Sequence, residues 1–186
     1  MKTRCGWAER DSLYMDYHDN EWGVPMHDDR KLFEFLILEG AQAGLSWITI
    51  LKKRENYRSV FDGFDAQKIA CYNDDKIKNL LLNDGIIRNR LKIESTVTNA
   101  RAFLKLQEEF GSFDNYIWQF VSYKPIKNSW TDISQVPSTS KESDKMSAEL
   151  KKSGFKFVGS TICYSFMQAV GMVNDHIVSC FRYDEV

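Results

Sequence analysis

The chain has 186 residues, of which 43% are hydrophobic and 27% charged, so its composition is globular and excludes a disordered or collagen-like polymer. Its formal net charge of -1 excludes a uniformly basic nucleic-acid coat, although a net value leaves open how the charges are distributed. A chain of this length can bury a substantial core, and we expect residues 1–186 to form a single unit.

Helical periodicity recurs along the chain, whereas strand signals are scarce. The apolar spacing predicts helices over 28–43, from Ser46 into the basic cluster 52–54, over 65–69 and over 74–83, with Asp28 or Asp29 capping the first. A longer amphipathic segment spans 86–110, and further helices are expected at 113–121, 141–152 and 159–172. The segment 123–140 contains two prolines and predicts a long irregular connection. The expected fold class is all-α, with two helical lobes.

The compartment is indicated by what the chain lacks. The amino terminus has no apolar core behind its basic residues, so it does not predict a secretory signal. The longest uncharged stretch, 157–174, approaches membrane-spanning length but contains Gly, Ser, Thr and Gln, which is typical of a buried helix. We expect a cytoplasmic protein without membrane association, whose cysteines stay reduced and act as core residues or metal ligands.

Two Cys–His pairs lie near opposite ends of the chain. His176 and Cys180 have i, i+4 spacing, which on a helix places both side chains on one face. Cys5 and His18 at the other end complete a set of two thiolates and two imidazoles, typical of a closed structural zinc site. The wide separation of the pairs is unlike a compact zinc finger. A buried Cys5 with an exposed His176, or a Cys5–Cys180 disulfide in an oxidising compartment, remain alternatives.

The other cysteines and the third histidine have simpler interpretations. Cys71 and Cys163 have apolar neighbours in the sequence and no nearby histidine, so we expect both in the core. His27 precedes Asp28 at a predicted helix start, where a surface position is expected.

Glu39 is one of only two charged residues, with Glu34, in the twenty-residue run 32–51. Such a carboxylate either faces water at a helix end or is buried for a functional reason. Four aromatic residues lie nearby in the chain and either pack in the core or stack on a flat or cationic ligand: Tyr14, Tyr17, Trp22 and Trp47.

The sequence LLLNDGIIRNRLK, residues 80–92, predicts a helix, a tight turn containing Gly85, and a second helix that starts at once. Backbone N–H groups at such a helix start can bind a phosphate. The region is locally basic, because one acid, Glu94, stands among Arg88, Arg90, Lys92, Arg101 and Lys105. The coincidence of turn and charge favours contact with duplex DNA; a solvated helix face is the alternative.

Three long runs carry a resemblance to a known family: CGWAERDSLYMDYHDNEWGVP (5–25), LEGAQAGLSWITILKKRENYR (38–58) and GFKFVGSTICYSFMQAVGMVNDH (154–176). They resemble the bacterial 3-methyladenine DNA glycosylase I family, and the resemblance extends over about 4–180. It implies a helix-hairpin-helix DNA glycosylase fold, with that motif at about 74–105. It also implies one structural zinc joining the amino- and carboxy-terminal regions through Cys5, His18, His176 and Cys180.

The resemblance also implies roles for individual residues. Glu39 would take hydrogen bonds from the methylated base and is the expected catalytic residue. Tyr17 and Trp47 would stack on the base, and Tyr14 would line its pocket. Gly44 and Leu45 match the loop that enters the DNA stack, with further DNA contacts expected from the hairpin residues Gly85, Arg88 and Arg90.

The implied activity is hydrolysis of the N-glycosidic bond of 3-methyladenine in double-stranded DNA, leaving an abasic site. The 3-methyladenine type resembles neither the glycosylases with a catalytic Asp nor those with a nucleophilic Lys, so a monofunctional enzyme is expected, as a monomer. Two alternatives remain open. One is a non-enzymatic, zinc-stabilised protein that binds alkylated DNA; the other is a broader alkylpurine glycosylase that also removes 7-methylguanine.

Overall fold

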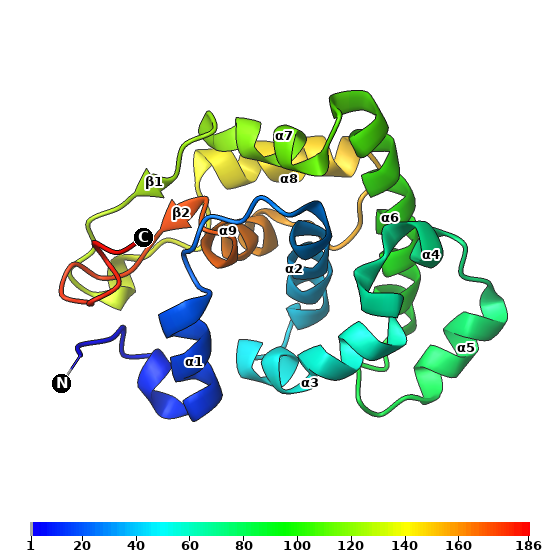
Figure 1. Cartoon of the computed structure of the whole chain (residues 1–186), viewed down its shortest axis with the longest axis horizontal. Helices are drawn as coiled ribbons and strands as arrows, with labels where there is room; N and C mark the ends of the chain where they lie inside the picture. Colours follow the sequence, from blue (N-terminus) through cyan, green and yellow to red (C-terminus); the bar gives the residue numbers. More distant parts are fainter. Residues whose placement is uncertain (1) are drawn as a thin grey trace.

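The computed structural model describes residues 2–186 and is built mainly from helices (Figure 1). Most predicted helices are confirmed within a few residues. The α-helices are α1 (Ser12–Asn20), α2 (Asp29–Gln42), α3 (Trp47–Val60), α4 (Ala66–Ala70), α5 (Asp74–Leu82), α6 (Arg90–Phe110), α7 (Phe113–Trp118), α8 (Lys141–Lys152) and α9 (Ser160–Ala169). Short 3-10 turns add η1 (Ala8–Arg10), η2 (Asp62–Phe64), η3 (Gln119–Val121) and η4 (Ile133–Gln135).

Helix α2 is the centre of the fold. Ten of its fourteen residues are buried, and it packs against α3, α6, α7 and α9. Asp28 caps its amino end by accepting a hydrogen bond from the Lys31 N–H at 2.9 Å, as the sequence predicts. Asp29 has a different role, because its carboxylate accepts the N–H groups of Phe113 and Asp114 at the start of α7. The helix that carries Glu39 is thereby fixed at the end opposite to Glu39.

The hairpin between α5 and α6 differs from its prediction in one respect. Helix α6 begins at Arg90, with Asn89 as its N-cap, so it does not follow Gly85 at once. The Gly85 N–H donates to Asn83 Oδ1 at 2.8 Å, and the Ile87 N–H donates to the Tyr57 hydroxyl at 3.1 Å. One amide is therefore used within the turn and the other by a side chain of α3, so they do not form the exposed phosphate cradle that was expected.

The predicted helix 159–172 ends early, at Ala169. Gly171 follows with φ +70°, and a Cβ atom built on it would lie 2.3 Å from the backbone of Val24 and Pro25. The chain can therefore turn there and pass tightly beneath the 24–25 segment only because this residue is glycine. It then forms β2 (Val173–Asn174), which pairs in parallel with β1 (Ile126–Lys127), a strand pair the sequence did not predict.

The two ends of the chain lie on the same side of the molecule (Figure 1). The Phe181 N–H donates to the Thr3 carbonyl at 2.9 Å, which ties the last residues directly to the first. Helix α1, also unpredicted, stands between these ends and α3. In the described part of the chain no helix is both long and apolar enough to span a bilayer.

Candidate metal centre and base pocket

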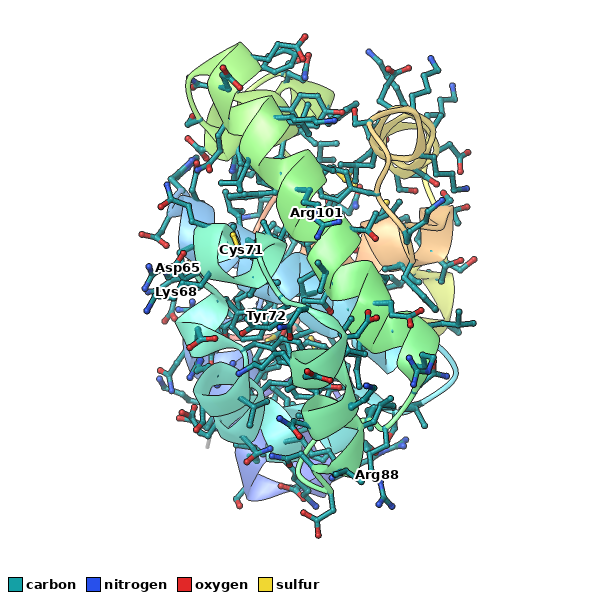
Figure 2. The ribbon with its side chains drawn as sticks, turned by 90° about the vertical axis from the view of Figure 1, so that its right-hand side faces the viewer. Asp65, Lys68, Cys71, Tyr72, Arg88 and Arg101 are labelled. Carbon is teal, nitrogen blue, oxygen red and sulfur yellow. The ribbon has the colours of Figure 1, made fainter. Side chains whose placement is uncertain are left out.

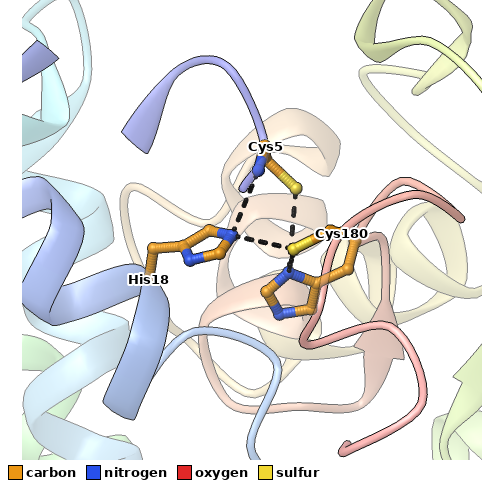
Figure 3. A group of neighbouring side chains, drawn as sticks. Cys5, His18 and Cys180 are labelled. Atoms are coloured by element: carbon orange, nitrogen blue, oxygen red, sulfur yellow. Dashed lines mark hydrogen bonds between the residues drawn. The ribbon is translucent and has the colours of Figure 1, made fainter. Parts of the chain in front are cut away.

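Cys5, His18, His176 and Cys180 converge in the interior, where the two ends of the chain meet. Figure 3 shows three of them, Cys5, His18 and Cys180, with their side chains directed toward one another. Their four potential ligand atoms all lie within 4.8 Å of one another, and all four residues are buried. Cys180 Sγ is 3.4 Å from His18 Nε2 and 3.5 Å from His176 Nδ1. Tetrahedral ligands bound at about 2.0–2.3 Å are separated by about 3.3–3.8 Å, so the group matches a four-coordinate metal site.

The outer nitrogen of each imidazole is held by an acceptor. His18 Nδ1 lies 2.8 Å from Asp19 Oδ1, and His176 Nε2 lies 3.1 Å from the Trp22 carbonyl. These acceptors hold a proton on the outer nitrogens and leave the inner ones as lone-pair donors, as in metal-ligating histidines. The pKa of Cys180 is lowered, chiefly by its hydrogen bond from Cys5, so a thiolate is favoured at the centre. The arrangement is that of a preformed metal site.

The other predictions for the cysteines and for His27 are partly confirmed and partly wrong. All four cysteines are free thiols, so the Cys5–Cys180 disulfide is wrong, and Cys163 is buried as expected. His27 is exposed, as predicted, and pairs with Asp114. The core position of Cys71 is wrong: this residue follows α4 and is exposed on the outer face shown in Figure 2. Its apolar neighbour Ile69 points inward instead, because the helix ends there and the chain turns.

Beside the metal centre lies a cavity of about 280 Å³, lined by the amino-terminal region, by the α2–α3 segment and by α9. Tyr14 and Tyr17 come from α1, Glu39 from the last turn of α2, and Trp47 from the first turn of α3. The structure therefore brings together the four residues that the resemblance assigned to one base pocket. Trp22, for which core packing and ligand stacking both stood open, also lines it.

Among the described residues that line this cavity, Glu39 alone is acidic, and its exposed fraction is 4%. Burial alone raises its pKa to about 8, because a carboxylate in an apolar wall loses its hydration. The alternative of a solvated helix end is therefore wrong. Tyr17 faces the same space, and its pKa is raised by burial and then by the charge of Glu39. An empty pocket at neutral pH thus holds Glu39 largely protonated.

The aromatic walls are fixed by contacts among themselves. The Tyr17 and Trp47 ring centroids are 5.7 Å apart and inclined by 52°, and Trp7 meets Tyr14 and Trp22 edge to face. The Tyr14 hydroxyl accepts the Ile48 N–H at 2.9 Å and so holds α3 against α1. Trp47 Nε1 is buried and has no hydrogen-bond partner within residues 2–186, which leaves a donor for a ligand.

Five further lining residues were not identified from the sequence as part of the pocket: Trp7, Gln42, Ile133, Ser165 and Gln168. Ile133 lies in η4, within the connection predicted to be irregular, and is exposed at the edge of the cavity. Trp7, Gln42, Ser165 and Gln168 stand in the three runs that carry the resemblance, and that position was their only available signal. Ser165 and Gln168 lie on α9 and reach the pocket only through tertiary packing.

The predicted DNA contacts lie on the surface. Gly44 and Leu45 form the exposed turn between α2 and α3, and Gly44 adopts φ +78°. Arg88 and Arg90 are exposed beside the hairpin; Figure 2 shows Arg88 well separated from Arg101. Arg101 lies against α4 and not beside the hairpin, because its Nε donates to the Ala70 carbonyl at 2.9 Å. The basic run in the sequence is therefore divided between two places.

Comparisons with solved structures define the class. A crystal structure of 3-methyladenine DNA glycosylase I superposes with a TM-score of 0.94 at 53% identity, covering 96% of this chain and 98% of the other. A variant of 3-methyladenine DNA glycosylase I in complex with 3-methyladenine gives a TM-score of 0.93 at 35% identity, with 96% of each chain covered. The helix-hairpin-helix DNA glycosylase fold expected from the sequence is confirmed.

Sequence comparisons agree. The chain is 53% identical to DNA-3-methyladenine glycosylase 1 of Escherichia coli over 97% of its length and 96% of the relative. It is 49% identical to DNA-3-methyladenine glycosylase of Haemophilus influenzae, covering 97% of each. Residues 7–183 match the profile of the methyladenine glycosylase family, and the chain belongs to that family.

Proposed function

We propose that this protein is a DNA-3-methyladenine glycosylase that hydrolyses the N-glycosidic bond of 3-methyladenine in double-stranded DNA and leaves an abasic site. The observation that carries the proposal is the buried carboxyl group of Glu39 in a cavity walled by aromatic rings, in a chain of the methyladenine glycosylase family. The relative solved with 3-methyladenine has the same fold.

The pocket suits a flat, cationic base. A 3-methyladenine nucleoside carries a positive charge, which weakens its glycosidic bond, so the departing base needs no further proton. Tyr17 and Trp47 present ring faces that attract a cation, worth about 0.5–2 kcal/mol per contact. Normal adenine lacks the charge and gains none of this attraction.

Glu39 adds selectivity through its buried carboxyl group. When a cationic base enters, the positive charge favours the carboxylate over the acid, so Glu39 ionises and accepts hydrogen bonds from the base. This attraction offsets the few kcal/mol needed to extrude the nucleotide from the duplex. A neutral base leaves the carboxyl protonated or unpaired, which penalises its binding. The unpartnered Trp47 Nε1 provides a further donor.

The reaction proceeds without a protein nucleophile. No lysine or aspartate is among the described residues that line the cavity, which supports hydrolysis through an oxocarbenium-like transition state. The product is then an abasic site in an uncut strand.

Two neighbouring segments outside the cavity hold the DNA in this proposal. Gly44 and Leu45 occupy the turn between Glu39 and Trp47, where they can fill the space that the extruded nucleotide leaves. Arg88 and Arg90 supply positive charge for the phosphate backbone beside the hairpin. Gly85 keeps the hairpin tight, because a Cβ at this position would lie 2.1 Å from Asn56 Nδ2.

The metal is proposed to be zinc with a structural role, one per chain. Two thiolates and two imidazoles are a donor set that suits zinc, and Cys5, His18, His176 and Cys180 would fill all four positions. A zinc ion held there would cross-link the ends of the chain and support α1, which carries Tyr14 and Tyr17. We propose a monomer, because a single chain supplies the whole pocket and all four ligands.

The deciding experiment is chromatography of bases released from methylated duplex DNA, followed by alkali treatment of the strand. Free 3-methyladenine with strand breaks only after alkali supports the proposal. Binding without base release identifies the alternative of a non-enzymatic sensor of alkylated DNA. Comparable release of 7-methylguanine identifies the broader alkylpurine glycosylase. Strand cleavage through a borohydride-trapped intermediate overturns the monofunctional mechanism.

A further inference from the structure

We propose that Lys92, although it stands in the basic hairpin, is a positioning residue for the turn 41–45 rather than a phosphate contact. The proposal rests on the proposed glycosylase function. Lys92 Nζ donates to the carbonyl oxygens of Ala41 at 2.8 Å and Ala43 at 2.7 Å. These residues lie directly before Gly44 and Leu45, so one ammonium group joins the hairpin to the turn proposed to enter the DNA stack.

The carbonyl groups at the carboxy-terminal end of α2 are stabilised by a cation from outside the helix. The last carbonyls of a helix lack partners within the helix and carry partial negative charge. Helix α2 has no basic residue in its own last turn, so no side chain of its own can satisfy them as a cation. Lys92, in the first turn of α6, supplies the missing charge from another element.

A second set of contacts closes the turn from its other side. The Leu45 N–H donates to the Gln42 carbonyl at 2.7 Å, and Gln42 Nε2 donates to the Leu45 carbonyl at 2.7 Å. Only the tip, Gly44 and Leu45, is left exposed. Because Glu39 precedes this turn and Trp47 follows it, a shift of the turn displaces both the carboxyl group and one aromatic wall.

Lys92 differs from the nearby Arg88 and Arg90 in its burial and in its hydrogen-bond partners. It is partly buried, and desolvation lowers its pKa, whereas Arg88 and Arg90 are exposed. Arg88 has no ion-pair partner within residues 2–186, and Arg90 pairs with Glu94 in the adjacent turn at 3.1 Å. An ammonium group that already binds two carbonyl oxygens is poorly placed to release counterions from a phosphate backbone. Lys92 therefore links the hairpin to the turn 41–45 without itself contacting a phosphate.

The test compares Lys92→Met with Arg88→Met in the full-length, metal-loaded protein. One measurement is the slope of log Kd for unmodified duplex DNA against log salt concentration. The others are the single-turnover rate of base release at saturating DNA and the fluorescence of a 2-aminopurine placed beside the lesion, which reports base extrusion. Lys145→Met, an exposed position on α8, serves as a control for the loss of one lysine.

We expect Lys92→Met to lower the single-turnover rate by about 10- to 100-fold, as expected for a displacement of about 1 Å. The 2-aminopurine signal should fall as well, and the salt slope should be unchanged. Arg88→Met should instead reduce the slope by about 1. Lys92→Arg keeps the donors and should recover most of the rate, which guards against a Lys92→Met protein that fails to fold.

Two outcomes overturn the positioning role. The first is a salt slope that falls by about 1 in Lys92→Met with the rate at saturation unchanged, which identifies a phosphate contact. The second is a Lys92→Met protein that matches wild type in all three measurements. Failure of the wild-type protein to release 3-methyladenine is a separate result and contradicts the proposed function itself.

Discussion

Cys180 Sγ lies 3.4 Å from His18 Nε2, although 162 positions separate the two residues in the chain. This contact, with those of Cys5 and His176, closes the polypeptide into a loop at the site proposed for zinc. A cross-link between such distant positions restricts the unfolded chain strongly, so the site should affect stability more than chemistry.

Cys180→Ser should therefore lose the bound metal and unfold more easily. We expect its free energy of unfolding to fall by about 3 kcal/mol or more. For a chain of this size, a fall of about 3 kcal/mol lowers Tm by roughly 6–12 °C. Metal analysis and a thermal scan check this, with Cys71→Ser as the control because that thiol is exposed. If mild chelation stops base release while the circular dichroism spectrum remains native, the metal has a catalytic role after all.

Glu39→Gln should reduce the release of 3-methyladenine by at least about 100-fold, because the amide cannot ionise in response to a cationic base. Affinity for unmodified duplex DNA should change less than about twofold, since Glu39 lies inside the pocket. Glu34→Gln is a matched control on the same helix: it breaks the ion pair with Arg58 but leaves the cavity intact. Equal loss of DNA affinity and base release in Glu39→Gln contradicts its proposed role.

Stability should depend on pH through Glu39. Its pKa rises from 4.5 to about 8 on folding, so between these values the folded protein retains a proton that the unfolded chain has lost. The contribution of Glu39 is full below pH 4.5 and is lost as pH rises through 8, with a slope of up to about 1.4 kcal/mol per pH unit. Urea unfolding at several pH values should show this loss in wild type relative to Glu39→Gln. Parallel curves for the two proteins would exclude a raised pKa.

Gly85→Ala should damage the hairpin, since the added methyl group would lie 2.1 Å from Asn56 Nδ2. Overpacking of this kind costs about 1–3 kcal/mol. Asn56 also donates to Asn83 Oδ1, the acceptor of the Gly85 N–H, so its displacement should loosen the whole turn and weaken DNA binding. Gly159→Ala is the control, because a Cβ there meets nothing within 4 Å. Equal stability of the two variants shows that Asn56 moves aside freely.

Features controlled by local sequence were predictable. Apolar spacing predicts α2 and α8, and the side-chain acceptor of Asp28 predicts the N-cap of α2. Helix α1 was missed because its buried residues, Tyr17 and His18, form no continuous apolar stripe; they are buried by the pocket and the metal centre, which are tertiary features. The short strand pair was missed for the same reason, since two-residue strands carry no period.

The site was only partly visible in the sequence. Spacing alone left the metal ligands and the burial of Glu39 undecided. The resemblance to a family implied a ligand set and a base pocket, and the structure shows that the four ligand atoms lie together and that Glu39 is buried. Gln168 could not be found because its side chain is oriented by the buried carboxylate of Asp175, which accepts its Nε2 at 2.8 Å. The exposure of Cys71 depends on where α4 ends, which apolar neighbours do not indicate.

The ends of the chain that meet at the metal centre are made at different times. Cys5 and His18 leave the ribosome early, whereas His176 and Cys180 are synthesised long after them, and domains are built from the amino terminus onward. During most of synthesis, α1 therefore has no metal centre to hold it. Trp7, Tyr14 and Tyr17, which line the base cavity, belong to the segment that is tied to the carboxy-terminal residues only once Cys180 is available. The contact between the two ends is thus among the last that the growing chain can make, and it lies directly beside the base cavity.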